Sequence, residues 1–307
     1  MRLLLAAIVF HALLCSTVVP DVPQWVATAP ACVGYNGESD SSGRIVHSFT
    51  TSTGGTFKMR CDPATGKVTI RGKLAGENTS YDQDVAALNA LAEALALPLA
   101  SIKVNTVETG RSSATKEAPT AFLAQIARAT YGHLQRPFYA TEPPRKAKAP
   151  LQYVAHSNEV RVKIYDRGTF AALRSRPDVG NCLRFELHYL TSRRIGAVMG
   201  WNGGVTLASL IDVDVYKALA QKLLDSWKSI HLPVAMNSEL TYKDLALLKA
   251  GQDPAYWVAI KPGTAPATYK RLRVRFAELQ RDQPAATANP YGQQMEGLLT
   301  ALRESAK

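Results

Sequence analysis

The side chains best suited to chemistry are concentrated in two short segments near the middle of the chain. Lys163 and Tyr165 lie two residues apart in one run of alternating apolar residues, and Arg184 and Glu186 lie two apart in another. Residues two apart in a β-strand share a face, so paired strands could bring an ammonium, a phenol and a carboxylate together. A phenol is a weak nucleophile at neutral pH. Its attack on a phosphodiester requires a cation beside the phenolate and a metal that polarises the phosphate.

The same residues also have a purely structural interpretation. Tyr165 could be a strand tyrosine half buried against its neighbours, which is the commoner place for such residues. Glu186 beside Arg184 could be an exposed cross-strand ion-pair partner. Spacing alone therefore leaves both hypotheses open.

Period-two alternation predicts the strands that would position these residues. Strands are expected at residues 45–51, 56–60, 67–71, 101–107, 151–155, 160–165 and 181–189. An Ala-rich helix follows a capping box formed by Ser80 and Gln83, and a second helix is expected at residues 119–129. A later helix carries Val215, Leu219, Leu223 and Trp227 on one face. We therefore expect an α+β fold, an antiparallel sheet with packed helices, followed by a C-terminal helical region.

The C-terminal part of the chain, from about residue 233, is predicted to be helical and basic. In residues 268–279, three apolar residues fall on one helix face and cations cover the rest. The apolar residues are Leu272, Phe276 and Leu279, and the cations are Lys270, Arg271, Arg273 and Arg275. Such a helix could lie along phosphates, and it could equally be a solvated face that binds nothing.

Composition favours an anionic partner. The 307 residues carry a formal net charge of +11 and have a pI near 9.5. Lys and Arg side chains that neutralise phosphates release condensed counterions, so nucleic acid is the first expectation and a membrane surface the second. The four cysteines lie far apart, which argues against a zinc site and favours free thiols.

The N-terminus resembles a secretory signal. Arg2 precedes an apolar run over residues 3–14, which is too short to span a bilayer. A buried first strand or helix, or a mispredicted start codon, explains the run equally well. Residues 33–43 are rich in Gly, Ser, Asn and Asp and predict a loop, so the folded part is expected to begin near Arg44.

Several motifs resemble those of filamentous-phage gene II-type and plasmid rolling-circle replication initiation proteins. Residues 163–168 (KIYDRG) and 183–187 (LRFEL) carry the resemblance, in the same order and spacing as in that family. Further segments resemble the phage group at residues 47–52, 67–73, 248–254 and 268–273. The resemblance extends from about Arg44 to Leu279.

This resemblance implies a metal-dependent enzyme that nicks one DNA strand at a replication origin and stays attached to the 5′ end through a phosphotyrosine. The free 3′-OH would serve the host polymerase, and the enzyme would later rejoin the strand. By its match to the family motif at residues 163–168, the resemblance implies that Tyr165 is the nucleophile and Lys163 is the cation beside it. A second tyrosine, Tyr189 or Tyr153, could serve the rejoining step.

The implied metal is Mg²⁺ or Mn²⁺, with Glu186 as a candidate ligand. Family members place an Asp in the strand that matches residues 103–106, whereas this chain has Asn105, with Glu108 three residues on. The segment after Arg167 also lacks the glutamate of the family. DNA contacts are expected from Arg161, Arg167, Arg184, Lys270, Arg271, Arg273 and Arg275.

The expected organisation has three parts. Residues 1–43 form an apolar segment and loop, residues 44–232 the nicking domain, and residues 233–307 a basic helical region. The expected partners are supercoiled duplex DNA at an origin and the host replication machinery, in the bacterial cytoplasm, with no stable membrane association. Two alternatives stay open: a non-catalytic basic DNA-binding protein, and an exported periplasmic binding protein.

Overall fold

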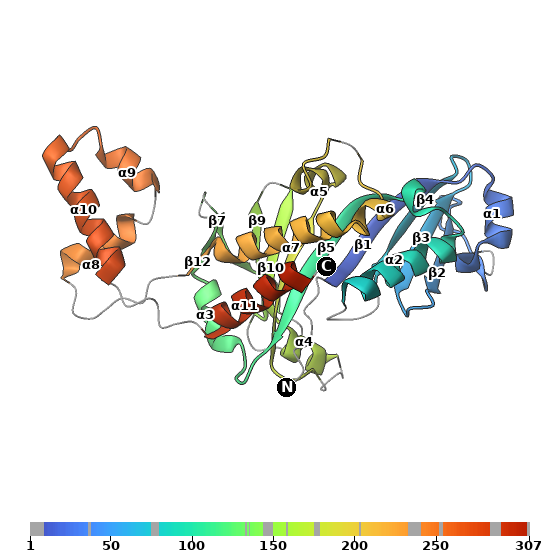
Figure 1. The fold of residues 1–307 in the computed structure, drawn as a ribbon, viewed down its shortest axis with the longest axis horizontal. Coiled ribbons are helices and arrows are strands. Elements are labelled where there is room, and N and C mark those ends of the chain that lie inside the picture. The colour runs from blue at the N-terminus through green and yellow to red at the C-terminus, as the bar shows by residue number, and fades with distance from the viewer. Residues whose placement is uncertain are drawn as a thin grey trace.

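A nine-stranded sheet forms the centre of the molecule (Figure 1). The computed structural model describes residues 9–35, 38–74, 80–132, 134, 136–143, 150–157, 159–174, 179–202, 204–232, 241–251, 254–282 and 290–305. Within these residues the strand order is β2-β3-β4-β1-β5-β11-β10-β9-β8, and every paired strand is antiparallel. The expected α+β class with an antiparallel sheet is confirmed.

The strands expected from alternation are present with small shifts in their ends. They are β2 (Ile45–Thr50), β3 (Thr56–Asp62), β4 (Lys67–Lys73), β5 (Lys103–Ala114), β9 (Gln152–Ser157), β10 (Val160–Asp166) and β11 (Cys182–Tyr189). The short strand β8 (Tyr139–Ala140) closes one edge, and β6 (Thr130–Tyr131), β7 (Arg136–Pro137) and β12 (Ile230–His231) form a small second sheet.

The apolar N-terminal run supplies a strand of the sheet, β1 (Val9–Val18), which lies between β4 and β5. Leu13 and Cys15 are buried in the core. The ordered sheet therefore begins well before Arg44, where the sequence predicted its start. The reason is that apolar side chains of β1 are buried between the sheet and the helices that cover it. Helix α1 (Val22–Thr28) and the 3-10 helix η1 (Pro30–Cys32) follow it. Residues 1–8 lie outside the described part of the chain.

Helices cover one face of this sheet (Figure 1). They are α2 (Tyr81–Leu95), α3 (Thr120–Ile126), α5 (Ser192–Val198), α6 (Leu207–Leu210), α7 (Val213–Lys228) and α11 (Pro290–Ser305), with the short turn η2 (Leu99–Ser101) after α2. The capping box predicted at Ser80 and Gln83 is present. The predicted apolar face of α7 is also buried, and its Trp227 ring packs 5.1 Å from that of Phe185 in β11.

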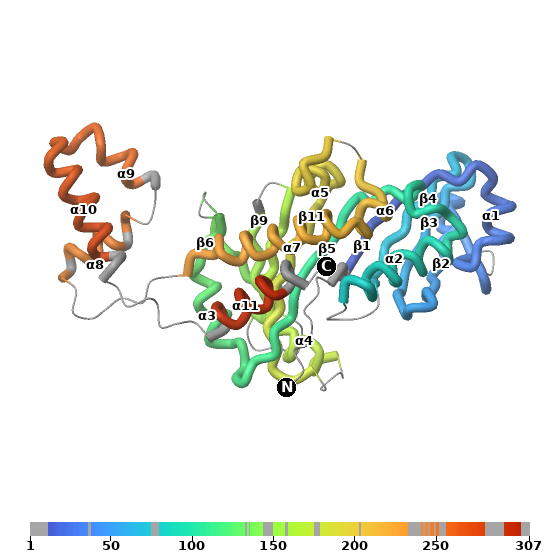
Figure 2. Tube along the Cα trace, in the orientation of Figure 1, coloured from blue at the N-terminus to red at the C-terminus, as the bar shows by residue number. Residues whose placement is uncertain are grey.

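The C-terminal helices lie in two separate places (Figure 2). Helices α8 (Tyr242–Gly251), α9 (Pro254–Ile260) and α10 (Pro266–Asp282) share a small core of their own around Trp257. Helix α11 instead packs on α7, and its Met295 and Leu299 belong to the main core. The C-terminal helical region is thus confirmed, but its last helix belongs to the helix layer that covers the sheet. Among the described residues, none of the helices is long and apolar enough to cross a bilayer.

Candidate active site

The sheet face opposite the helices carries a polar grid on β5, β11 and β10. Apolar residues of β11, such as Phe185, point into the core, so their polar neighbours point to the other side. Strand register aligns the grid in three rows: Glu108, His188 and Arg161, then Gly110, Glu186 and Lys163, then Ser112, Arg184 and Tyr165. The predicted meeting of a phenol, an ammonium and a carboxylate on neighbouring strands therefore occurs.

Tyr165 donates a hydrogen bond from its hydroxyl to Glu186 Oε1 at 2.9 Å. Its ring is half-buried and packs edge-on against Phe170, with ring centroids 5.6 Å apart. Burial raises the pKa of the Tyr165 phenol well above its usual range, and the Glu186 carboxylate raises it further. The phenol is therefore neutral at physiological pH, and Glu186 is the group placed to accept its proton.

The residues after Tyr165 build the turn that supports its ring. Asp166 caps helix α4 (Arg167–Leu173), because its Oδ1 accepts the Thr169 backbone N–H at 2.8 Å. Helix α4 in turn carries Phe170. Gly168 has no room for a side chain, since a Cβ there would lie 2.0 Å from the Gly180 carbonyl oxygen. The motif around Tyr165 thus forms the capped turn into α4 that holds Phe170 against the Tyr165 ring.

Glu186 is buried and held from several sides. Arg184 Nε lies 2.5 Å from its Oε1, and Lys163 Nζ lies 3.8 Å from its Oε2. Gly110, its partner on β5, leaves space for it: a Cβ at that position would come within 2.7 Å of Glu186 Cγ. The position of the carboxylate therefore depends on a glycine in the adjacent strand.

Lys163 forms an ion pair with Glu108, a contact between β10 and β5 across β11. His188 Nδ1 lies 3.6 Å from Glu108 Oε1 in the same row. Burial lowers the pKa of His188, and this lowering outweighs the opposing effect of Glu108, so the imidazole is neutral at pH 7. Sequence reasoning missed His188, although its place two residues after Glu186 in the same strand was a usable signal.

Two of the arginines expected to contact DNA are structural. Arg184 is fully buried, and its Nη1 donates to Ser112 Oγ at 2.9 Å. Arg167 is also buried and donates to the same oxygen at 2.9 Å. Buried guanidinium groups cannot reach a phosphate, so these two residues position the site and Ser112 joins them. Arg161, half-buried at the end of the grid, remains placed to meet a ligand.

The three residues proposed as metal ligands do not gather around one point. Asn105 turns to β1, where its Nδ2 donates to Ser16 Oγ at 2.9 Å. Glu108 and Glu186 share Lys163, whose ammonium takes the position a cation would occupy. In the described residues no group of three or more His, Cys, Asp or Glu side chains could hold a metal ion. As placed, this donor set does not fit Mg²⁺ or Mn²⁺, which require several oxygen ligands in near-octahedral geometry.

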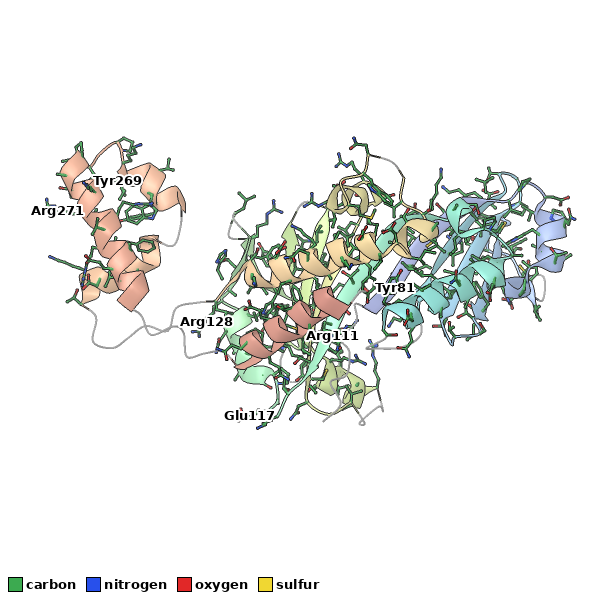
Figure 3. All side chains as sticks on the ribbon, viewed as in Figure 1. Tyr81, Arg111, Glu117, Arg128, Tyr269 and Arg271 are labelled. Atoms are coloured by element: carbon green, nitrogen blue, oxygen red, sulfur yellow. The ribbon has the colours of Figure 1, made fainter. Side chains whose placement is uncertain are left out.

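The other candidate residues lie away from the grid. Tyr189 and Tyr153 point to the helix-covered face, and burial raises the pKa of Tyr189 above its usual range. On α10, Lys270 and Arg271 are exposed. Figure 3 labels Arg271 on this helix. Arg273 lies over the Trp257 ring at 4.8 Å, and Arg275 is paired with Asp244 at 2.9 Å. The charged groups of Arg273 and Arg275 are therefore already engaged within the small helical unit.

Comparison with known proteins finds a likeness in overall fold but none in sequence. No protein-family model matches the chain, and no curated protein matches it. A rolling circle replication initiator protein from Geobacillus stearothermophilus is similar in structure, with a TM-score of 0.41 and 10% sequence identity. The match covers 77% of this chain and 90% of that one. At this level the likeness does not assign a family.

Proposed function

We propose that this chain is a rolling-circle DNA replication initiator that nicks one strand with Tyr165 and remains bound to its 5′ end. The observation that carries the proposal is the hydrogen bond from the Tyr165 hydroxyl to Glu186, beside the Lys163 ammonium. The motifs at residues 163–168 and 183–187, together with the net charge of +11, support the same function. Its partners would be an origin duplex and the host polymerase that extends the 3′ end, in the bacterial cytoplasm.

The geometry supports a general-base mechanism. Glu186 takes the phenol proton as Tyr165 attacks phosphorus, and the bond from phosphorus to the 3′ oxygen breaks. The proton then passes from Glu186 to the leaving 3′ oxygen, which restores the carboxylate. Lys163 and Arg161 are the cations on this face that can stabilise the developing charge on the phosphate. No step is assigned to Mg²⁺ or Mn²⁺.

Covalent capture tests the proposal. Supercoiled DNA that carries the cognate intergenic region is incubated with the protein, and denaturing electrophoresis detects nicked circles with protein attached. The wild-type chain should give this product, and Tyr165→Phe should give none. Tyr139→Phe is a matched control, because Tyr139 lies exposed on β8 in the same sheet. Attachment that survives in Tyr165→Phe would rule out the assigned nucleophile.

A non-catalytic DNA-binding protein on this scaffold is the second candidate. The observation that favours it is the internal pairing of the grid, where Glu108 and Glu186 both face cations and the phenol is held protonated. This candidate predicts equal DNA binding by the wild-type chain and Tyr165→Phe, and no covalent product from either. The electrophoresis above therefore separates the two functions.

A further inference from the structure

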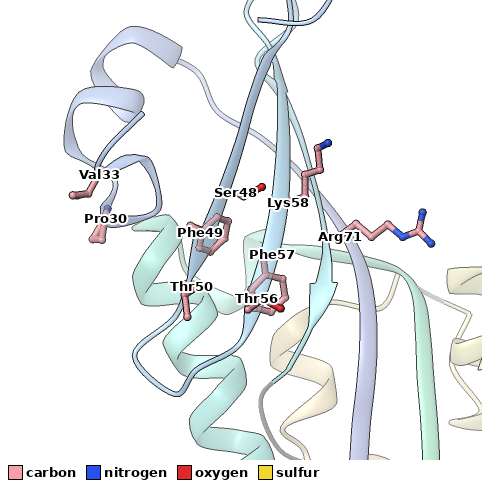
Figure 4. Close-up of a pocket in the computed structure, with 9 residues that line it drawn as sticks. All are labelled: Pro30, Val33, Ser48, Phe49, Thr50, Thr56, Phe57, Lys58 and Arg71. Carbon is pink, nitrogen blue, oxygen red and sulfur yellow. The ribbon is translucent and has the colours of Figure 1, made fainter. Parts of the chain in front are cut away.

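The face that carries Tyr165 continues across the sheet into a basic stripe on β3 and β4. We define the basic stripe as Lys58, Arg71 and Lys73. All three are exposed, whereas residues between them, such as Met59 and Ile70, are buried on the helix side. Figure 4 shows Lys58 and Arg71 on adjacent strands, at the edge of a pocket of about 670 Å³.

The basic stripe contains an unfavourable charge arrangement. Lys58 and Arg71 lie directly opposite each other in the β3–β4 register, and like charges in that position destabilise a sheet. In the part of the chain that the structure describes, no acidic side chain forms an ion pair with the three cations. Their neighbours differ, since Arg60 pairs with Asp40 at 3.3 Å and Arg44 with Asp62 at 3.7 Å. An external anion would relieve this repulsion.

The side chains around the basic stripe suit a phosphate backbone. Ser48 and Thr56 lie exposed beside Lys58 and Arg71, and hydroxyl groups are frequent partners of phosphate oxygens. A membrane surface would instead require exposed aromatic and leucine side chains, which this part of the face does not carry among its described residues. Nucleic acid is therefore the favoured ligand.

The basic stripe and the candidate active site lie on one continuous surface. Arg71 pairs with Leu14 of β1, and Leu14 pairs with Thr106 of β5, two residues before Glu108. Five strand steps separate β3 from β10, or about 24 Å at the usual strand spacing. The row of Tyr165 meets β5 at Ser112, six residues or about 20 Å along the strand from Thr106, so the two sites lie about 31 Å apart. This distance corresponds to about nine base-pair steps of duplex.

We propose that the basic stripe binds the DNA backbone about nine base pairs from the phosphate that Tyr165 attacks. The stripe fixes the position of the DNA without reading its sequence. The distance to the nick rests on the proposed function, but binding by the basic stripe does not. Binding and covalent attachment are therefore measured separately.

Salt-dependent binding tests the proposal. Fluorescence anisotropy follows a short labelled duplex at increasing salt, with Tyr165→Phe in every chain so that no DNA is captured covalently. Adding Lys58→Ala and Arg71→Ala should make the slope of log K against log salt shallower by about 1.8, since each lost phosphate contact contributes about 0.9. Cognate and scrambled duplexes should weaken alike.

The matched control removes two cations from the opposite layer. Lys217 and Lys222 lie on α7, so Lys217→Ala with Lys222→Ala makes the same change in net charge and should leave the slope unchanged. The proposal fails if the stripe variant keeps the original slope, or if both double variants lose the same amount. It also fails if the stripe variant loses binding only to vesicles of phosphatidylserine and phosphatidylcholine.

Two further measurements keep the outcomes distinct. Thermal unfolding should show the stripe variant to be as stable as its parent, because the removed side chains are exposed and repel each other. The covalent assay on the same substitutions, with Tyr165 restored, reports on nicking. Absence of covalent product from the wild-type chain would overturn the proposed function and leave the slope measurement valid.

Discussion

At the scale of single residues, Gly110 controls the candidate site although it has no functional group. A Cβ at this position would lie 2.7 Å from both Glu186 Cγ and the Phe185 carbonyl oxygen. Relief therefore requires both a shift of β5 away from the β11 backbone and a displacement of the Glu186 side chain. Displacing Glu186 would break its hydrogen bond with Tyr165.

We therefore expect Gly110→Ala to reduce covalent DNA attachment at least tenfold, or about 1.4 kcal/mol in the barrier. Stability should fall by about 1–3 kcal/mol through overpacking. The rate of attachment and a urea denaturation curve measure the two effects. Gly297→Ala in α11 is the control, because a Cβ there meets nothing within 4 Å. An unchanged rate in Gly110→Ala would show that Glu186 is not the base.

Lys163 acts as an internal counter-ion for two carboxylates. Replacing it with Met keeps much of the side-chain volume but leaves Glu108 and Glu186 facing each other without the ammonium between them. Two adjacent carboxylates repel, and a divalent cation would neutralise both.

We expect Lys163→Met to gain thermal stability from Mn²⁺, and the wild-type chain to gain none. At a concentration ten times Kd, bound ion stabilises the folded state by about 1.4 kcal/mol, which is a rise of roughly 3 °C in Tm. Differential scanning calorimetry with Mn²⁺ and then with EDTA measures this rise. An equal rise in the wild-type chain would mean that the metal displaces Lys163, and would restore a metal to the mechanism.

At the scale of elements, local sequence patterns predicted the strands and helices whose formation depends on local interactions. The strands β2 to β4, the capped helix α2 and the apolar face of α7 follow from alternation, caps and helical spacing. Residue spacing also predicted that Lys163 shares a strand face with Tyr165, and Arg184 with Glu186. The β10–β11 register then brings the two pairs together.

The remaining features depend on contacts between distant parts of the chain. No local pattern places β1 between β4 and β5, because that position depends on hydrogen bonds to two distant strands and on the apolar surface that β1 buries there. Likewise, Gly110 and Ser112 join the site only through the β5–β11 register. The same register buries Arg184 beside Ser112, and Arg167 at the start of α4 reaches the same hydroxyl. A sequence cannot distinguish such arginines from exposed DNA-binding ones.

At the scale of the whole molecule, the described residues form two hydrophobic cores that should unfold separately. The main core includes Met295 and Leu299 of α11, and Trp227 Nε1 of α7 donates to the Gly292 carbonyl at 3.3 Å. The small core contains Leu247, Leu248, Trp257 and Leu279. A substitution in one core should therefore leave the other intact.

We expect Leu299→Ala to destabilise the main core by about 2–5 kcal/mol, since it removes a fully buried side chain. Trp257→Ala should destabilise the small core by a similar amount and leave the polar grid unchanged. Calorimetry measures both transitions, and covalent attachment reports on the site. If Trp257→Ala shifts the main transition as far as Leu299→Ala does, the two cores form one cooperative unit. The basic residues of α10 would then be held rigidly to the sheet that carries Tyr165.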